Sequence, residues 1–279
     1  MVYLNFLYTV DNVYYDLMRL SIISAIKYHK GATFHIFTMD SPETNQIRVP
    51  RKNEEKLKRE IALIDPTAKI LFYNVRDLYL EKLGNSVNEY SRYTPYAALR
   101  LLAPYILNDV NLVLYLDADT IITDSLHKLF VQYSNKDFDV AMALENYNQQ
   151  NNDIPFLSGL ILFNLKYQRK TNYRFIDEVI RLYNSNIYPY PDQDALRFAS
   201  PAKRIILEGY YLHFEYDPNI EPRTKVVCVP FRNLSPVTEF MKNSVFHRNA
   251  INLYHISEYI AKQVSDINIK IYNEINNKK

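Results

Sequence analysis

Two aspartates, Asp117 and Asp119, have the residue type and the spacing of a site for a divalent cation. They directly follow a nearly unbroken apolar run, 111–116, which predicts a strand buried on both faces. Side chains two residues apart on an extended strand point the same way, so both carboxylates can converge on one point. Carboxylate oxygens at the carboxyl end of a central strand would suit Mg²⁺ or Mn²⁺, which commonly carry the phosphates of a substrate.

The spacing alone is not specific, because a short motif of this kind also arises by chance. The chain contains three Asp-x-Asp pairs: Asp117/Asp119, Asp137/Asp139 and Asp192/Asp194. The first pair differs from the others because it lies between the buried run and a second apolar pair, Ile121-Ile122. Surface carboxylates rarely lie inside such a run, since an unpaired buried charge is costly. We expect turn aspartates at 137 and 139, and a helix cap near Asp192.

The scarcity of glycine limits how a nucleotide could be held. The chain has only four glycines, Gly31, Gly84, Gly159 and Gly209, and they lie far apart. This excludes a phosphate-binding Gly-x-x-x-x-Gly-Lys loop, a Gly-x-Gly-x-x-Gly loop and a Gly-x-Ser-x-Gly nucleophile elbow. Any nucleotide phosphates must therefore be held by a metal ion and by side chains.

Composition narrows the class of protein further. The 279 residues suffice for one large α/β domain or two small ones, and the net charge of +2 gives no electrostatic reason to expect nucleic acid or an anionic membrane as a partner. No apolar run approaches the ~20 residues of a membrane span, and the start lacks the basic region of a signal peptide. The single Cys228 excludes an intrachain disulfide. We expect a cytoplasmic protein.

The first half of the chain alternates strands and helices. Apolar runs predict strands at 2–8, 33–39, 69–73 and 111–116, and helical spacing predicts helices at 14–28, 54–64 and from Pro95 to Tyr105. This order is typical of a parallel, doubly wound sheet, with a polar connection at 74–93. Arg100 lies among apolar residues of the third helix, where its stem either packs on the surface or its guanidinium points into the site.

The second half is predicted to be more mixed. Strands are expected at 139–144, 156–164, 205–214, 224–229 and 249–256, with helices at 175–183, after 189–194 and from a Ser257 cap. Ser158-Gly159 lies at the entrance of the second of these strands, where a missing side chain permits close backbone approach. His255 is expected near the end of the last strand.

With this layout, the chain resembles the family 8 glycosyltransferases over about residues 2–255. The most specific match is the run Leu114-Tyr-Leu-Asp-Ala-Asp-Thr-Ile-Ile-Thr-Asp-Ser-Leu-His-Lys-Leu129. Weaker matches follow in the family's order at 8–14, 96–104, Phe156-Leu-Ser-Gly159 and Asp192-Gln-Asp194. The resemblance implies a single GT-A domain over 1–279, with a Rossmann-like, mostly parallel sheet. Residues 1–124 would form its nucleotide-binding half, 125–260 its sugar- and acceptor-binding half, and 261–279 a C-terminal helix and tail.

The resemblance also implies which residues bind the substrates. The donor nucleotide and sugar would contact Tyr8, Thr9, Asp11, Tyr14, Arg100, Asp117, Ala118, Asp119, Glu145, Ser158 and Gly159. Within this set, Tyr14 would stack on uracil. Gln193 and Asp192 would lie at the reacting sugar, and Asp117, Asp119 and His255 would hold Mn²⁺ or Mg²⁺. The implied reaction moves a hexose, glucose or galactose, from a UDP-sugar to a hydroxyl of a glycan or protein acceptor with retention of configuration.

The chain departs from the family pattern at several positions. Leu157 replaces an expected Asn, and the closing motif is not intact because the chain has no Trp. His247 competes with His255 as the third metal ligand, and Lys262 lies one residue beyond the spacing of the phosphate-binding lysine. One alternative is therefore a non-catalytic UDP-sugar-binding or scaffold protein. A phosphatase using Asp-x-Asp is disfavoured, because Ile121 stands where that class has Thr or Val.

Overall fold

The computed structural model describes residues 4–91, 93, 95–144, 156–214, 223–229 and 251–276. The strands of the first half are β1 (Asn5–Thr9), β2 (Thr33–Thr38), β3 (Lys69–Asn74) and β4 (Leu112–Leu116). The helices between them include α1 (Tyr15–Tyr28) and α2 (Arg51–Ile64). β1 pairs in parallel with both β2 and β4, and β2 pairs in parallel with β3. The predicted alternation of strands and helices and the parallel sheet are therefore confirmed.

The main sheet has seven strands in the order β3-β2-β1-β4-β7-β6-β8. β7 (Phe156–Asn164) runs antiparallel to both β4 and β6 (Val140–Leu144), and β8 (Arg204–Leu207) runs parallel to β6. A second sheet joins β5 (Thr120–Ile122), β10 (Val226–Cys228) and β9 (His213–Phe214). The protein thus has a mixed α/β fold with a mostly parallel half and a smaller mixed portion, as predicted.

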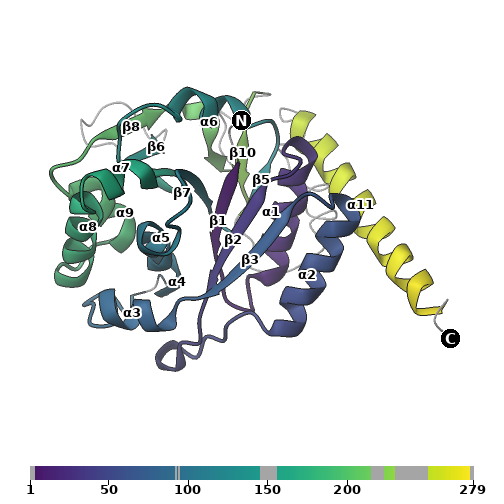
Figure 1. Ribbon diagram of the computed structural model, residues 1–279, viewed down its shortest axis with the longest axis horizontal. Helices are drawn as coiled ribbons and strands as arrows, with labels where there is room; N and C mark the ends of the chain where they lie inside the picture. Colours follow the sequence, from purple (N-terminus) through teal and green to yellow (C-terminus); the bar gives the residue numbers. More distant parts are fainter. Residues whose placement is uncertain are drawn as a thin grey trace.

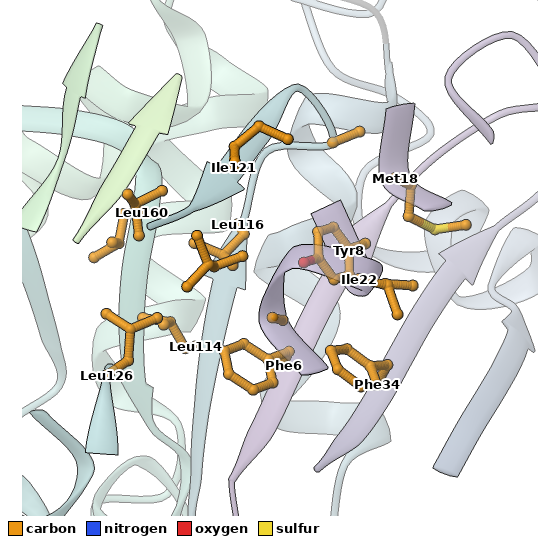
Figure 2. Packing of buried hydrophobic residues seen from close by; sticks show 14 of the residues in the cluster. Phe6, Tyr8, Met18, Ile22, Phe34, Leu114, Leu116, Ile121, Leu126 and Leu160 are labelled. Carbon is orange, nitrogen blue, oxygen red and sulfur yellow. The ribbon is translucent and has the colours of Figure 1, made fainter. Parts of the chain in front are cut away.

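Helices cover both faces of the main sheet (Figure 1). Alternate residues of each central strand face opposite layers, so Leu114 and Leu116 pack with Phe6, Met18 and Ile22 beneath α1 (Figure 2). The other layer includes α8 (Arg174–Ser185) and α9 (Pro191–Phe198), beside α7 (Leu165–Lys170). Because all five residues of β4 are buried, the end of this strand holds its functional groups at a fixed position.

The helix predicted from Pro95 is present but divided into three pieces. It consists of α4 (Pro95–Ala98), a 3₁₀ segment η2 (Leu99–Leu102) and α5 (Ala103–Ile106). Pro104 has no amide hydrogen and cannot donate to the carbonyl of Arg100. The amide of Ala103 donates to that carbonyl instead, which is the tighter 3₁₀ pattern.

Three sequence-based expectations were wrong. The connection at 74–93 contains a helix, α3 (Arg76–Lys82), and the strand at 205–214 is divided into β8, a 3₁₀ turn (Gly209–Tyr211) and β9. The strand at 249–256 and the Ser257 cap are replaced by one helix, α11 (Ile251–Asn276). Its buried residues Ile256, Ile260 and Ile267 repeat with helical spacing, which a window of eight residues does not reveal.

Asp137, Asp139 and Asp194, from the other two aspartate pairs, form structural contacts. Asp137 forms an exposed ion pair with Lys170, and the Asp139 carboxylate accepts the amide of Lys203. Asp194, in the first turn of α9, reaches back to accept the amide of Tyr190, the residue before the helix, as one side chain of a capping box does. None of the helices in the described residues is long and apolar enough to cross a membrane.

A buried ion pair between α1 and α2 gives a test of this packing. Arg19 Nε lies 2.5 Å from Glu60 Oε2, and the Glu60 side chain is only 1% exposed. Arg19→Met should lower the free energy of unfolding by about 3 kcal/mol, because it leaves a buried carboxylate without its closest partner. Urea denaturation at neutral pH measures this change.

Lys58→Met is the matched control, because Lys58 pairs with Glu55 on the exposed face of α2. It should change the unfolding free energy by about 0.5 kcal/mol or less. Equal effects of the two substitutions would contradict a structural role for the buried pair.

Candidate active site

A cavity of about 320 Å³ lies where the chain leaves the carboxyl ends of β1 and β4. It is lined by Thr9, Val10, Asp11, Tyr14, Gln46, Tyr93, Tyr96, Ala97, Arg100, Tyr115, Asp117, Ala118 and Asp119. Seven of these residues were predicted as site residues: Thr9, Asp11, Tyr14, Arg100, Asp117, Ala118 and Asp119. The structure therefore brings these seven predicted residues together at one end of the sheet.

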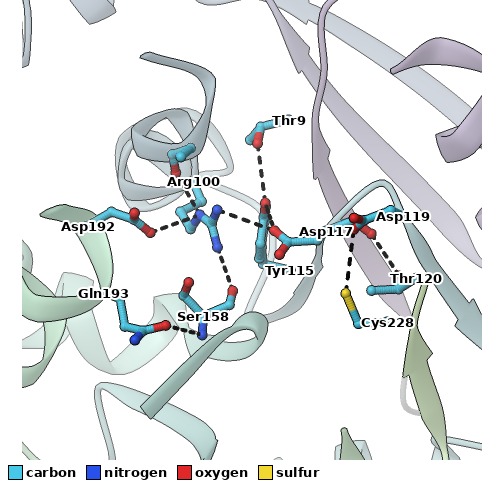
Figure 3. Close-up of polar contacts among 11 residues, drawn as sticks. Thr9, Arg100, Tyr115, Asp117, Asp119, Thr120, Ser158, Asp192, Gln193 and Cys228 are labelled. Carbon is cyan, nitrogen blue, oxygen red and sulfur yellow. Dashed lines mark hydrogen bonds and ion pairs between the residues drawn. The ribbon is translucent and has the colours of Figure 1, made fainter. Parts of the chain in front are cut away.

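Asp117 is held by its neighbours on three sides (Figure 3). The Tyr115 hydroxyl donates to Asp117 Oδ1 at 2.6 Å, and Arg100 Nη2 lies 3.3 Å from the same oxygen. The Asp117 amide donates to the carbonyl of Gly159 on β7. Residues 117–120 form a turn, closed by the amide of Thr120 on the Asp117 carbonyl, and do not continue the strand as expected. Both aspartates still line one cavity.

Arg100 is the buried cation of this site. Its Nε donates to the carbonyl of Ala97 at 2.6 Å and its Nη1 to the carbonyl of Ser158. Its Nε also lies 3.4 Å from Asp192 Oδ2, and its guanidinium carbon lies 4.0 Å from the centre of the Tyr115 ring. The guanidinium therefore points into the site and joins Asp117 to Asp192.

Asp119 lies on the other side of Asp117, next to β10. The Cys228 thiol donates to its Oδ1 at 3.8 Å, and its backbone carbonyl accepts the amide of Val229. Burial raises the pKa of Asp119 to about 7, and the charge of Asp117 contributes in the same direction. Two carboxylates that repel each other in a cavity wall fit a divalent cation, which would stabilise their charged forms.

The loop between β1 and α1 forms another part of the wall. Asp11 Oδ1 accepts the amides of Val13 and Tyr14, and its Oδ2 accepts Gln46 Nε2 at 3.1 Å. These bonds fix the loop in front of α1. Tyr14 lines the cavity and the residue is 44% exposed, so a ligand in the cavity can reach its side chain.

Asp192 and Gln193, at the start of α9, lie close to the Arg100 end of the site (Figure 3). Gln193 Oε1 accepts the amide of Ser158 at 3.1 Å. Asp192 is buried and its Oδ2 has no hydrogen-bond partner among the described residues, although it pairs with Arg100. Burial raises the pKa of Asp192, and the charge of Arg100 acts against this shift. The structure thus brings both predicted sugar-binding residues to the site.

Gly159 permits the close approach of β7 that the sequence predicted. A Cβ atom at this position would lie 3.0 Å from Asp117 Oδ2 and 3.5 Å from a methyl group of Leu212. A side chain at this position would therefore press against the first aspartate, whose carboxylate would have to shift by a few tenths of an ångström.

Two predicted site residues lie elsewhere. Tyr8 is fully buried and donates or accepts a hydrogen bond with Ser21 of α1, because it faces the opposite layer from Thr9. His255 is exposed on α11, with Nδ1 4.0 Å from Glu258, and this helix packs against α1 and α2. The described residues contain no group of three His, Cys, Asp or Glu residues that could hold a metal ion, so His255 does not join the aspartates.

Three further residues named from the sequence remain to be placed, and the cavity wall also contains residues that were not predicted. Glu145 and His247 lie outside the described residues. Lys262 is exposed on α11, the helix that also carries His255. Gln46, Tyr93, Tyr96 and Tyr115 line the cavity without having been predicted. Of these, Tyr115 carried a signal, since it is a polar residue inside a buried strand.

Comparisons with known proteins agree with this architecture. The model of glycosyl transferase family 8 matches residues 5–214. Among solved structures, the apo form of the bifunctional glycosyltransferase WbbM is 16% identical with a TM-score of 0.65, covering 90% of this chain and 52% of its own. The galactosyltransferase LgtC, in complex with donor and acceptor sugar analogues, is 16% identical with a TM-score of 0.62 and coverage of 93% and 96%.

A third solved structure, apo GlyE from Streptococcus pneumoniae TIGR4, is 15% identical with a TM-score of 0.64, covering 95% of this chain and 64% of its own. The chain thus spans about half the length of WbbM and nearly all of LgtC. No curated protein matches the chain. At these low identities, the structural similarity shows the GT-A fold alone. The family model spans every residue of the cavity wall and shows that the chain belongs to glycosyl transferase family 8 and is a glycosyltransferase.

Proposed function

We propose that this glycosyltransferase moves a hexose, glucose or galactose, from a UDP-sugar to a hydroxyl of a glycan or protein acceptor, with retention of configuration. The observation that carries the proposal is that Asp117 and Asp119 line one cavity at the carboxyl end of β4, where the buried guanidinium of Arg100 joins Asp117 to Asp192. In the proposed site, Asp117 and Asp119 hold Mn²⁺ or Mg²⁺. When bound, the cation supplies positive charge to the diphosphate that leaves the sugar.

The charges of the site support a divalent cation. Four carboxylates, those of Asp11, Asp117, Asp119 and Asp192, lie at the site together with one guanidinium, so the fully ionised site carries an excess of three negative charges. A nucleoside diphosphate is itself an anion and would be repelled by this site. Arg100 is already engaged by Asp117, Asp192 and two carbonyls, which leaves little of its charge for the phosphates.

The loop 9–14 supplies the proposed nucleoside end of the site. Thr9 ends β1 on the cavity side, and Asp11 holds the loop through its three hydrogen bonds. The exposed aromatic side chain of Tyr14 at the cavity would stack on uracil.

The start of α9 supplies the proposed sugar end. Gln193 carries a neutral amide, which is a poor nucleophile. Its Oε1 accepts the amide of Ser158, so its role is to orient the sugar through the Nε2 amino group. Asp192, whose carboxylate pairs with Arg100, would lie next to a sugar hydroxyl at this end of the site. With no strong protein nucleophile proposed, the acceptor oxygen attacks from the side of the leaving diphosphate and forms the new bond as the old one breaks. The proton of the acceptor hydroxyl passes to the leaving diphosphate, and the configuration is retained.

Substitution of Asp119 tests the cation site. Asp119→Asn should reduce Mn²⁺-dependent UDP release from UDP-glucose or UDP-galactose by about 100-fold or more, because a neutral amide neither holds the cation nor balances its charge. Release is measured with both donors and a panel of saccharide and protein acceptors. The matched control is Asp137→Asn, which alters an exposed aspartate in another Asp-x-Asp pair and should leave release unchanged.

The outcomes separate an enzyme from a binding protein. Tight UDP binding by calorimetry, with no UDP release from the native protein under any condition, would favour a scaffold. Equal release by the native protein and Asp119→Asn would contradict the cation site.

Substitution of Gly159 tests the spacing between β7 and Asp117. Gly159→Ala should weaken Mn²⁺ binding about 10-fold, because the new methyl group displaces the Asp117 carboxylate by a few tenths of an ångström. Titration of Mn²⁺ by electron paramagnetic resonance measures this, with the melting temperature as a check on folding. Unchanged affinity in a folded variant would mean that the contact has no role in the site.

A further inference from the structure

Tyr115 is the one polar side chain in β4, whose sequence is Leu-Val-Leu-Tyr-Leu. The residue is only 2% exposed, in a strand whose other side chains are aliphatic. A buried hydroxyl costs free energy unless it forms a hydrogen bond, and a phenylalanine or leucine would fill the same space without that cost. The position of this hydroxyl therefore requires an explanation that packing does not provide.

The hydroxyl of Tyr115 lies between the nucleoside loop and the first aspartate (Figure 3). It is 2.6 Å from Asp117 Oδ1 and 3.4 Å from the Thr9 hydroxyl. An ionised carboxylate only accepts hydrogen bonds, so Tyr115 donates to Asp117 and its oxygen remains available to the Thr9 hydroxyl. Hydrogen bonds thus run from Thr9 through Tyr115 to Asp117.

The two oxygens of Asp117 have different surroundings. Oδ1 receives Tyr115 and faces Arg100 Nη2 at 3.3 Å. Oδ2 faces Gly159, and the described residues give it no hydrogen-bond donor. Two donors on one oxygen fix the rotation of the carboxylate and leave the other oxygen for a ligand.

The ring of Tyr115 also supports Arg100, whose guanidinium carbon lies 4.0 Å from the ring centre. A role for the ring and a role for the hydroxyl therefore have to be separated. Phenylalanine keeps the ring and removes the hydroxyl, whereas leucine removes both.

We propose that Tyr115 is a positioning residue: its hydroxyl orients Asp117 so that Oδ2 is the oxygen that binds the divalent cation, and it joins this carboxylate to Thr9 in the nucleoside loop. The inference rests on the proposed function, because it takes the cation site of Asp117 and Asp119 as given. Groups that orient metal ligands in this way commonly change metal affinity by about 10- to 100-fold when they are removed.

The experiment compares Tyr115→Phe with Tyr8→Phe. Both remove a hydroxyl from a buried tyrosine on adjacent parallel strands, and both hydroxyls form a hydrogen bond, but the hydroxyl of Tyr8 bonds Ser21 in the core. Mn²⁺ affinity is measured by electron paramagnetic resonance without nucleotide, together with the melting temperature. Tyr115→Phe should weaken Mn²⁺ binding about 10-fold or more, and Tyr8→Phe should leave it unchanged at a similar loss of melting temperature.

A kinetic readout distinguishes orientation from general damage. In Tyr115→Phe the Mn²⁺ concentration for half-maximal UDP release should rise by the same factor as the dissociation constant, while kcat at saturating Mn²⁺ stays within a few-fold of the native value. Tyr115→Leu should lower kcat as well, because Arg100 loses its support.

Each outcome has a defined meaning. Equal Mn²⁺ affinity of the native protein and Tyr115→Phe, with binding lost in Asp119→Asn, would overturn the positioning role and leave the cation site standing. Absence of Mn²⁺ binding by the native protein would overturn both. An equal loss of affinity in Tyr8→Phe and Tyr115→Phe would assign the effect to destabilisation and overturn the role of the Tyr115 hydroxyl.

Discussion

The burial of Arg100 is the constraint on which the arrangement of the site depends. A guanidinium that is only 4% exposed must have each of its donor groups matched, because an unmatched buried charge costs several kcal/mol. The partners come from separate parts of the chain: Ala97 from its own helix, Asp117 after β4, Ser158 from β7 and Asp192 from α9. Holding the Arg100 guanidinium in place therefore fixes the end of β4, the start of β7 and the start of α9 relative to one another.

The antiparallel strand β7 makes this arrangement possible. It pairs with β4 along its length, and the contact continues past the end of β4, where the Asp117 amide meets the Gly159 carbonyl. Ser158 then offers its carbonyl to Arg100 and its amide to Gln193. A parallel strand at this place would enter from the other end and present a different backbone edge, so the change of direction within the sheet has a direct consequence for the site.

The sequence predicted those parts of the fold and site that depend on short segments. Buried strands are recognisable by their apolar runs, and Asp117 and Asp119 by their place after one of them. The error at Tyr8 was avoidable, because strand alternation allows only one of Tyr8 and Thr9 to face the cavity. His255 was misplaced because 249–256 is compatible with a strand over eight residues, and only contacts with α1 and α2 show the helical period. Gln46 comes from the segment between β2 and α2, whereas Tyr93 lies just before α4 and Tyr96 within it. Their meeting depends on tertiary structure that no local pattern contains.

The electrostatics of the site connect its two proposed ligands. With the aspartates ionised, the site repels a nucleoside diphosphate, and burial already disfavours the charged forms of Asp119 and Asp192. A cation between the aspartates reverses both effects, because it stabilises the carboxylates and offers positive charge to the phosphates. In the proposed site the donor would bring further oxygen ligands to a cation that only two carboxylates of the described residues would hold. In the proposed site each ligand therefore strengthens the binding of the other, and by thermodynamic reciprocity the two coupling factors are equal.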